Sequence, residues 1–122
     1  MIKGFIIGHK NIGDGLLKAL ESISGSFENI FFFSNNGLST RELSDKICAA
    51  CNDGDDEVMI FIDVFGGSCW RAAKMAKLLR CHIVTGFNLP MLLSFVNKRN
   101  LFSFDELYTI IENDGKRGII SE

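Results

Sequence analysis

The chain has 122 residues, of which 47% are hydrophobic, and its formal net charge is −2. The length fits a single domain spanning residues 1–122, and the apolar content supports a buried core, which argues against a disordered chain. The lack of a basic surplus argues against a nucleic-acid partner, and the lack of a secretory signal or of an apolar run near the roughly 20 residues that cross a bilayer leads us to expect a cytoplasmic protein.

Strand-like and helix-like patterns alternate along the first half of the chain. Residues 2–7 form an apolar run that predicts a strand, and the helical spacing that follows it should end at Gly25. A second strand is expected at residues 30–33, followed by a helix that Ser39 or Thr40 should open, with Glu42 in a capping-box position relative to Ser39. An acidic turn at residues 52–57 comes next.

The second half of the chain repeats this order. The expected elements are a strand at residues 58–62, a helix that reaches about Leu79, a strand at residues 82–85, a further helix, and a last helix over residues 105–113. Asn88 should cap the helix that follows the fourth strand, and Gly115 should break the last helix.

These alternating patterns predict an α/β fold with a mostly parallel central sheet and helices on both faces. In such sheets, binding sites gather beyond the carboxyl ends of the strands, near the point where the strand order reverses. The residues that follow the predicted strands are therefore the first candidates for a functional site.

Four cysteines are present, and we expect them to be thiols because the chain lacks a secretory signal. Cys48 and Cys51 form a C-x-x-C pair, a spacing found in redox and zinc sites. The pair falls late in a predicted helix, whereas reactive pairs favour a helix N-terminus. A zinc site would need two more ligands, and Cys81 and His82 should point to opposite faces of a strand. We therefore favour small buried side chains over a metal or redox site.

His9 follows the first predicted strand and is flanked by Gly8 and Lys10. Its place at a strand end suits access more than packing, and a neutral imidazole is an available nucleophile near neutral pH. A surface loop histidine without a function is an equally good interpretation of its position alone. The second histidine, His82, is expected to be a structural or surface residue.

Asp63 ends the third predicted strand, so its carboxylate should lie at the same edge of the sheet. If the first and third strands are neighbours, the carboxylate would accept a hydrogen bond from one ring nitrogen of His9 and leave the other nitrogen free to attack. A cap for the following turn is the simpler alternative. A phosphorylated aspartate of the receiver type is disfavoured, because that site needs an acid pair after the first strand.

Gly66, Gly67 and Ser68 lead into the third predicted helix. Two glycines allow backbone N–H groups to face an anion, the helix N-terminus favours negative charge, and the serine hydroxyl adds a donor. The turn lacks the patterns of a Walker loop or a dinucleotide site, so a nucleotide is not indicated. Together with His9 and Asp63, the turn forms a candidate site for a transient phosphohistidine whose donor is another phosphoprotein, with no cofactor and no metal.

Four segments of the chain share a further pattern. They are residues 7–9 with 15–17, residues 62–68 (Ile-Asp-Val-Phe-Gly-Gly-Ser), residues 84–92 (Val-Thr-Gly-Phe-Asn-Leu-Pro-Met-Leu), and residues 102–107 with Gly115 and Gly118. On these segments the chain resembles the enzyme IIA domain of the mannose, fructose and sorbose family of phosphoenolpyruvate-dependent sugar phosphotransferase systems. The second and third segments are highly specific, and the resemblance covers nearly the whole chain.

The resemblance implies a phosphoryl carrier. His9 would accept the phosphoryl group from the carrier protein HPr and pass it to a histidine of the IIB partner, and the membrane IIC and IID components would then phosphorylate an entering sugar. The resemblance also implies that Asp63 holds Nδ1 of His9, so that Nε2 carries the group, and that Ser68 contacts the phosphoryl oxygens. The family forms homodimers in which an antiparallel C-terminal strand, here residues 118–121, is exchanged with the partner's sheet.

The sequence departs from the family pattern around the candidate site. Cys69 stands where the family usually has proline, Trp70 and Arg71 replace small or amide residues, and Lys10 stands where glycine is frequent. Lys10 and Arg71 would add positive charge near a phosphoryl group, and Trp70 would change a docking surface. Two other functions therefore stay open: a phosphohistidine regulatory module, and a non-catalytic binding module with a degenerate site.

Overall fold

The computed structural model describes residues 1–51 and 56–122, so most of the acidic turn expected at residues 52–57 lies outside the described residues. The strands are β1 (Lys3–Gly8), β2 (Ile30–Ser34), β3 (Val58–Ile62) and β4 (Cys81–Thr85). The helices are α1 (Ile12–Ser24), α2 (Thr40–Cys51), α3 (Ser68–Met75), α4 (Leu89–Lys98) and α5 (Phe104–Arg117).

These strands form one sheet in the order β2-β1-β3-β4, and every neighbouring pair is parallel. β1 is central, because Phe5 is in register with Phe31 of β2 on one side and with Ile60 of β3 on the other. The predicted α/β fold with a parallel sheet is confirmed. Since the strands run the same way, their carboxyl ends meet at one edge of the sheet, which we call the carboxyl edge.

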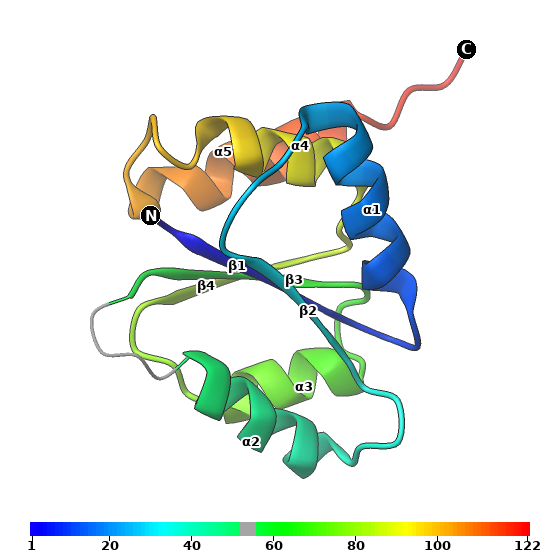
Figure 1. Ribbon diagram of the computed structural model, residues 1–122, viewed down its shortest axis with the longest axis vertical. Coiled ribbons are helices and arrows are strands. Elements are labelled where there is room, and N and C mark those ends of the chain that lie inside the picture. Colours follow the sequence, from blue (N-terminus) through cyan, green and yellow to red (C-terminus); the bar gives the residue numbers. More distant parts are fainter. Residues whose placement is uncertain (52–55) are drawn as a thin grey trace.

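Helices cover both faces of the sheet. α1, α4 and α5 lie on one face, and α2 and α3 lie on the other (Figure 1). Successive side chains of a strand point to opposite faces, so Ile6 of β1 joins the core under the first group of helices, whereas Phe5 and Ile7 join the core under the second. A strand buried on both sides has to be continuously apolar, which explains the unbroken run of β3, in which every residue is buried.

Most helix boundaries follow the sequence prediction. Asn88 caps α4 through its side chain, and Ser39 and Glu42 exchange side-chain to backbone hydrogen bonds in a capping box at the start of α2. α3 is shorter than expected and stops before Leu79. The chain leaves the helix there because Lys77 adopts a left-handed backbone conformation, with a φ of 49°.

The prediction that Gly115 breaks the last helix is wrong. α5 continues through Gly115 to Arg117. Gly115 is buried against α4, where an added Cβ would lie 2.9 Å from the methyl carbon of Met91 and 3.1 Å from its Cβ. Its carbonyl oxygen accepts a hydrogen bond from the Asn88 side chain at 2.9 Å. The glycine therefore allows two helices to pack closely, and packing outweighs its low helix propensity.

The residues after α5 do not join the sheet in this single chain. The C-terminal tail projects from the body of the molecule (Figure 1), and Ile119 and Ile120 are 77% and 75% exposed. The expected antiparallel pairing of residues 118–121 with a partner chain therefore stays a prediction. Within the described residues, no helix is both long enough and apolar enough to cross a membrane.

Candidate active site

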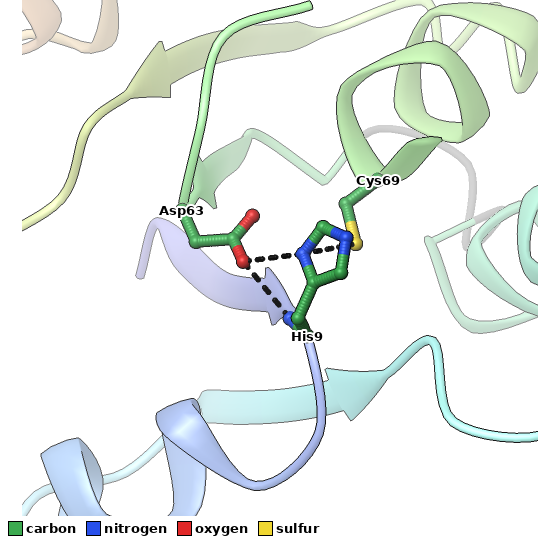
Figure 2. Close-up of side chains that lie close together, drawn as sticks. All are labelled: His9, Asp63 and Cys69. Carbon is green, nitrogen blue, oxygen red and sulfur yellow. Dashed lines mark hydrogen bonds and ion pairs between the residues drawn. The ribbon is translucent and has the colours of Figure 1, made fainter. Parts of the chain in front are cut away.

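The strand order brings two predicted site residues together. The chain passes from β1 out to β2 and then returns to β3 on the other side of β1, so the order reverses between β1 and β3. His9 follows β1 and Asp63 follows β3, which places both at the carboxyl edge beside this reversal. Figure 2 shows the Asp63 carboxylate turned toward the His9 ring, as expected for neighbouring strands.

The Asp63 carboxylate holds His9 at two points. Its Oδ2 lies 2.7 Å from Nδ1 of the ring and accepts a hydrogen bond from the His9 backbone N–H at 2.9 Å. Its Oδ1 accepts from the Val64 backbone N–H at 2.9 Å, so both oxygens are fixed. An ionised carboxylate only accepts hydrogen bonds, so this contact suits the Nδ1–H tautomer of a neutral ring, which leaves a lone pair on Nε2.

The two side chains differ in their access to solvent. The His9 side chain is 46% exposed, whereas the Asp63 side chain is 11% exposed. The ring is therefore open to an incoming group while the carboxylate orients it from beneath. Gly8 permits this close approach, because a Cβ there would lie 2.7 Å from Ile12 Cγ2 and 3.3 Å from Asp63 Oδ2.

The predicted glycine turn borders the His9 ring. Gly66 has a left-handed φ of 81°, which favours glycine, and Gly67 is the extended residue at the N-cap of α3. An added Cβ at Gly67 would lie 3.9 Å from His9 Cε1. Ser68 is the first residue of α3, and the first-turn N–H groups of a helix have no partners within the helix. The turn therefore offers donors and a positive helix end to an anion beside His9.

The structure adds Cys69 to this site, which the sequence prediction left out of its site residues. The buried sulfur lies 3.9 Å from His9 Nδ1 (Figure 2). Burial, together with the negative charge of Asp63, raises the pKa of the Cys69 thiol to about 11. The thiol is therefore protonated near neutral pH and is a poor nucleophile. Two features of the sequence point to Cys69: it directly follows Ser68, and it stands where the resembled family usually has proline.

Aromatic and basic side chains surround the turn. The Phe65 ring is 70% exposed and lies against Trp70, with ring centroids 4.9 Å apart. Arg71 donates from Nη1 to a backbone carbonyl of the glycine turn at 3.3 Å, which holds its guanidinium there. Lys10 instead donates from Nζ to Asn36 at 3.4 Å and is turned toward the β2–α2 loop. Of the two basic residues singled out in the sequence, Arg71 is the one held beside the turn.

The side chains that the sequence prediction discounted lie elsewhere. Cys48 and Cys51 are in the last turn of α2 and line a pocket with Arg80, which precedes β4. His82 stacks on the Tyr108 ring, with centroids 4.0 Å apart. Within the described residues, the cluster around His9 consists of His9, Asp63 and Cys69 and includes none of these side chains.

Comparison with known proteins decides the family. Residues 4–112 match the family model described as the fructose IIA component of the PTS, the sugar phosphotransferase system. The chain belongs to this family. This match confirms the resemblance drawn from the sequence. The chain is therefore a IIA component of the phosphotransferase system.

Two relatives support this family assignment, and a third protein shares the fold. The chain is 31% identical over 114 residues to the PTS system fructose-specific EIIA component of Bacillus subtilis, covering 88% of this chain and 77% of the relative. The crystal structure of phosphotransferase system component EIIA from Streptococcus agalactiae superposes with a TM-score of 0.90 and 27% identity, covering 99% of this chain and 97% of that chain. A mannose/sorbose-specific IIA subunit from Enterococcus faecalis shares the fold, with a TM-score of 0.83, 19% identity, and coverage of 99% and 94%.

Proposed function

We propose that this IIA component is a phosphoryl carrier that accepts its group on Nε2 of His9. The observation that carries the proposal is the contact between Asp63 Oδ2 and His9 Nδ1 at 2.7 Å. This contact fixes the neutral ring in the tautomer whose other nitrogen has a lone pair, and the ring is half-exposed toward solvent. A phosphoryl donor can therefore approach the nitrogen that is free to attack.

In the transfer step, His9 forms the new bond and Asp63 stabilises the charge that results. The Nε2 lone pair of His9 forms a bond to phosphorus while the nitrogen–phosphorus bond of a phosphohistidine donor breaks, and its electron pair leaves with the donor ring. Nδ1 keeps its proton, so the phosphorylated ring gains positive charge. The Asp63 carboxylate, held by its contacts to His9 and Val64, stabilises that charge.

The glycine turn supplies the place for the phosphoryl oxygens. The backbone N–H groups after Gly66 and Gly67, the Ser68 hydroxyl and the N-terminal end of α3 all favour an anion. The guanidinium of Arg71, held beside the turn, adds a positive charge nearby. Because phosphoryl transfer depends mainly on position and charge, these groups suffice without a metal or a nucleotide.

The donor and acceptor in this proposal are proteins. We assign HPr as the donor and a IIB component as the acceptor, with the membrane IIC and IID components receiving the group in turn, and the chain acting in the cytoplasm. The exposed Phe65 ring and its neighbour Trp70 form an aromatic patch beside the turn, a composition found at docking surfaces. In this scheme the sugar never contacts the chain, so its identity rests with the other components.

The proposal also includes a homodimer. β4 is an outer strand, and a groove of about 580 Å³ runs beside it, with Phe65 and Trp70 among its lining residues on one side and Glu112 and Lys116 of α5 on the other. An extended tail with two exposed isoleucines is suited to pairing with such an edge. We therefore propose that residues 118–121 of one chain add a strand to β4 of a second copy.

The test is phosphorylation of the purified chain by phosphoenolpyruvate, enzyme I and HPr, followed by intact mass. Wild type should gain one acid-labile phosphoryl group, and His9→Ala should gain none while keeping its circular dichroism spectrum. His82→Ala is the matched control, since it removes the other histidine, and it should still be phosphorylated. A folded His9→Ala protein that takes up the group contradicts the site. A wild type that takes up nothing from a matching HPr points to a degenerate binding module.

A further inference from the structure

Three different metal-ligand atoms meet at the carboxyl edge. They belong to His9, Asp63 and Cys69, and all lie within 4.8 Å of one another. Nδ1 of the His9 ring lies 2.7 Å from Asp63 Oδ2 and 3.9 Å from Cys69 Sγ. Figure 2 shows the carboxylate and the sulfur approaching the ring from two sides. In residues 1–51 and 56–122, this is the one cluster of three such side chains.

We infer that His9, Asp63 and Cys69 form a binding site for a thiophilic divalent cation of the Zn²⁺ class. The ligands would be Nδ1, Oδ2 and Sγ, with water in the fourth position. A nitrogen, an oxygen and a sulfur donor in one set are typical of zinc, whereas magnesium and calcium take oxygen donors. Three protein ligands with one open position is a common zinc arrangement.

The separations between these atoms suit a tetrahedral ion. Zinc bond lengths of about 2.0–2.3 Å place neighbouring ligand atoms about 3.4–3.6 Å apart. The two separations from Nδ1 lie on either side of this range, and the third, between the Asp63 carboxylate and Cys69 Sγ, is within 4.8 Å, so shifts of about an ångström bring the atoms to it. The half-exposed His9 side chain can make much of the adjustment, and the remaining shift brings the Asp63 carboxylate toward the buried Cys69 sulfur.

The charges and protons of the site also balance around such an ion. A carboxylate and a thiolate together neutralise a divalent cation, and the thiol proton is released to solvent when the sulfur binds. Nδ1 cannot bind the ion while it carries a proton, so that proton moves to Nε2. The metal-bound ring therefore presents N–H, and no lone pair, at the nitrogen that faces solvent.

This exchange gives the cation a regulatory effect, a consequence that rests on the proposed phosphoryl transfer at Nε2. Phosphoryl transfer needs the Nδ1–H tautomer held by Asp63, and the cation needs the opposite tautomer. The two states of His9 are mutually exclusive. Bound cation therefore blocks uptake of the phosphoryl group, and a chelator restores it.

The binding test uses Co²⁺ as the probe, titrated into the full chain in the presence of a phosphine reductant. We expect one equivalent per chain and a near-ultraviolet charge-transfer band, which reports a cobalt–thiolate bond. Cys69→Ser should lose the band, and His9→Gln should weaken binding by about tenfold or more. Cys81→Ser is the matched control, since it removes a thiol on β4, and it should keep the band. His9→Gln alters a surface side chain, so it tests the site even if Cys69→Ser does not fold.

The outcomes separate this inference from the proposed function. A missing band in wild type, or a band that persists in folded Cys69→Ser, overturns the site. For the regulatory effect, uptake from purified phospho-HPr is compared with Zn²⁺ and with Zn²⁺ plus chelator. Zn²⁺ should slow wild type at least tenfold and leave the rate of Cys69→Ser nearly the same with and without the ion. A wild type that binds Co²⁺ but takes up no phosphoryl group even without metal would contradict the proposed function and leave the metal site intact.

Discussion

At the scale of the residue, the site depends on a carboxylate that makes several contacts at once. Asp63 holds the ring nitrogen and the backbone N–H of His9 with one oxygen and the next residue's N–H with the other. The carboxylate has little room to move, so the ring is oriented before any partner arrives. In the proposed phosphoryl transfer, such prior orientation would lower the cost of reaching the transition state.

Replacing the carboxylate by an amide tests this role. We expect Asp63→Asn to fold normally and to accept the phosphoryl group about tenfold to a hundredfold more slowly, because an amide cannot balance the positive charge on the phosphorylated ring. The measurement is the rate of mass increase during phosphorylation by HPr. Asp105→Asn is the control, since that exposed carboxylate pairs with His82, and its rate should equal that of wild type. An unchanged rate for Asp63→Asn would contradict the charge-stabilising role.

The residues of the site were predictable to different degrees. The approach of Asp63 to His9 follows from the sequence once their strands are neighbours, because parallel strands end at one edge. Cys69 was not predictable in this way. Its contact depends on how the first turn of α3 faces the loop after β1, and a side chain's direction across two elements is set by the packed fold rather than by local spacing.

At the scale of the element, two glycines of α1 have opposite surroundings. An added Cβ at Gly13 would lie 2.0 Å from Phe32 Cδ1 and 2.6 Å from its Cγ, whereas one at Gly15 would meet nothing within 4 Å. The helix therefore rests directly on β2 at Gly13. Packing requires a glycine at Gly13, whereas Gly15 has room for a larger side chain.

Alanine substitutions on this helix should change stability in opposite directions. Gly13→Ala should lower the free energy of unfolding by about 1–2 kcal/mol, since the overlap with Phe32 exceeds the gain in helix propensity. Gly15→Ala should raise it by up to about 1 kcal/mol, because only the propensity gain operates. Urea denaturation of the two variants beside wild type measures both. Equal effects at the two positions would show that the contact with Phe32 does not limit the helix.

The α4–α5 pair is linked by a second feature, the carboxylate of Asp114. It accepts from Ser94 Oγ at 2.5 Å and from Lys98 Nζ at 2.6 Å, and Arg117 lies 3.3 Å away. These hydrogen bonds, first that from Lys98 and then that from Ser94, lower the pKa of Asp114 below its ordinary value of 3.8. A lowered folded-state pKa means that the carboxylate stabilises the fold above about pH 4, and that this contribution disappears as the pH falls further.

Asp114→Asn should therefore be less stable than wild type at neutral pH by about 1 kcal/mol, because a charged acceptor of two hydrogen bonds is lost. The difference should shrink below about pH 4, where wild type itself becomes protonated. Thermal unfolding of both proteins across this pH range measures the change. A difference that stays constant with pH would mean that the charge of Asp114 does not contribute.

Predictability also varied among the elements. The strands and most caps were found from sequence because their signals are local, such as the apolar run of β3 and the side chain of Asn88. The end of α5 was predicted wrongly because the effect of Gly115 depends on α4. A glycine that would destabilise an isolated helix is favourable where a second helix packs too closely for a Cβ.

At the scale of the whole molecule, the sheet has two outer strands, and only one of them lies beside the groove that we propose for the partner's tail. β4 borders that groove. The C-terminal tail of one chain would occupy the groove of the other chain, and its Ile119 and Ile120 are exposed in the single chain. Open sheet edges tend to recruit further strands. Dimerisation would cover this edge and bury both isoleucines.

Charged substitutions in the tail test the dimer. We expect wild type to sediment as a dimer and the double variant Ile119→Lys with Ile120→Lys to sediment as a monomer, because lysine ammonium groups resist burial. Ile23→Lys is the control, since it changes another exposed isoleucine, on α1, and it should remain a dimer. A monomeric wild type in sedimentation equilibrium would overturn the exchange of the tail.

The central place of β1 also governs the order in which the protein can fold. β1 pairs with β2 and β3, yet β3 comes later in the chain and leaves the ribosome after the other two. Until β3 is available, the core around Phe5 and Ile7 lacks the β3 side chains that complete it. The core therefore forms only after a distant segment has been made, and such non-local pairing is slow. A fragment of residues 1–57 should accordingly show no cooperative thermal transition by circular dichroism, and a sharp transition would show that the first half folds unaided.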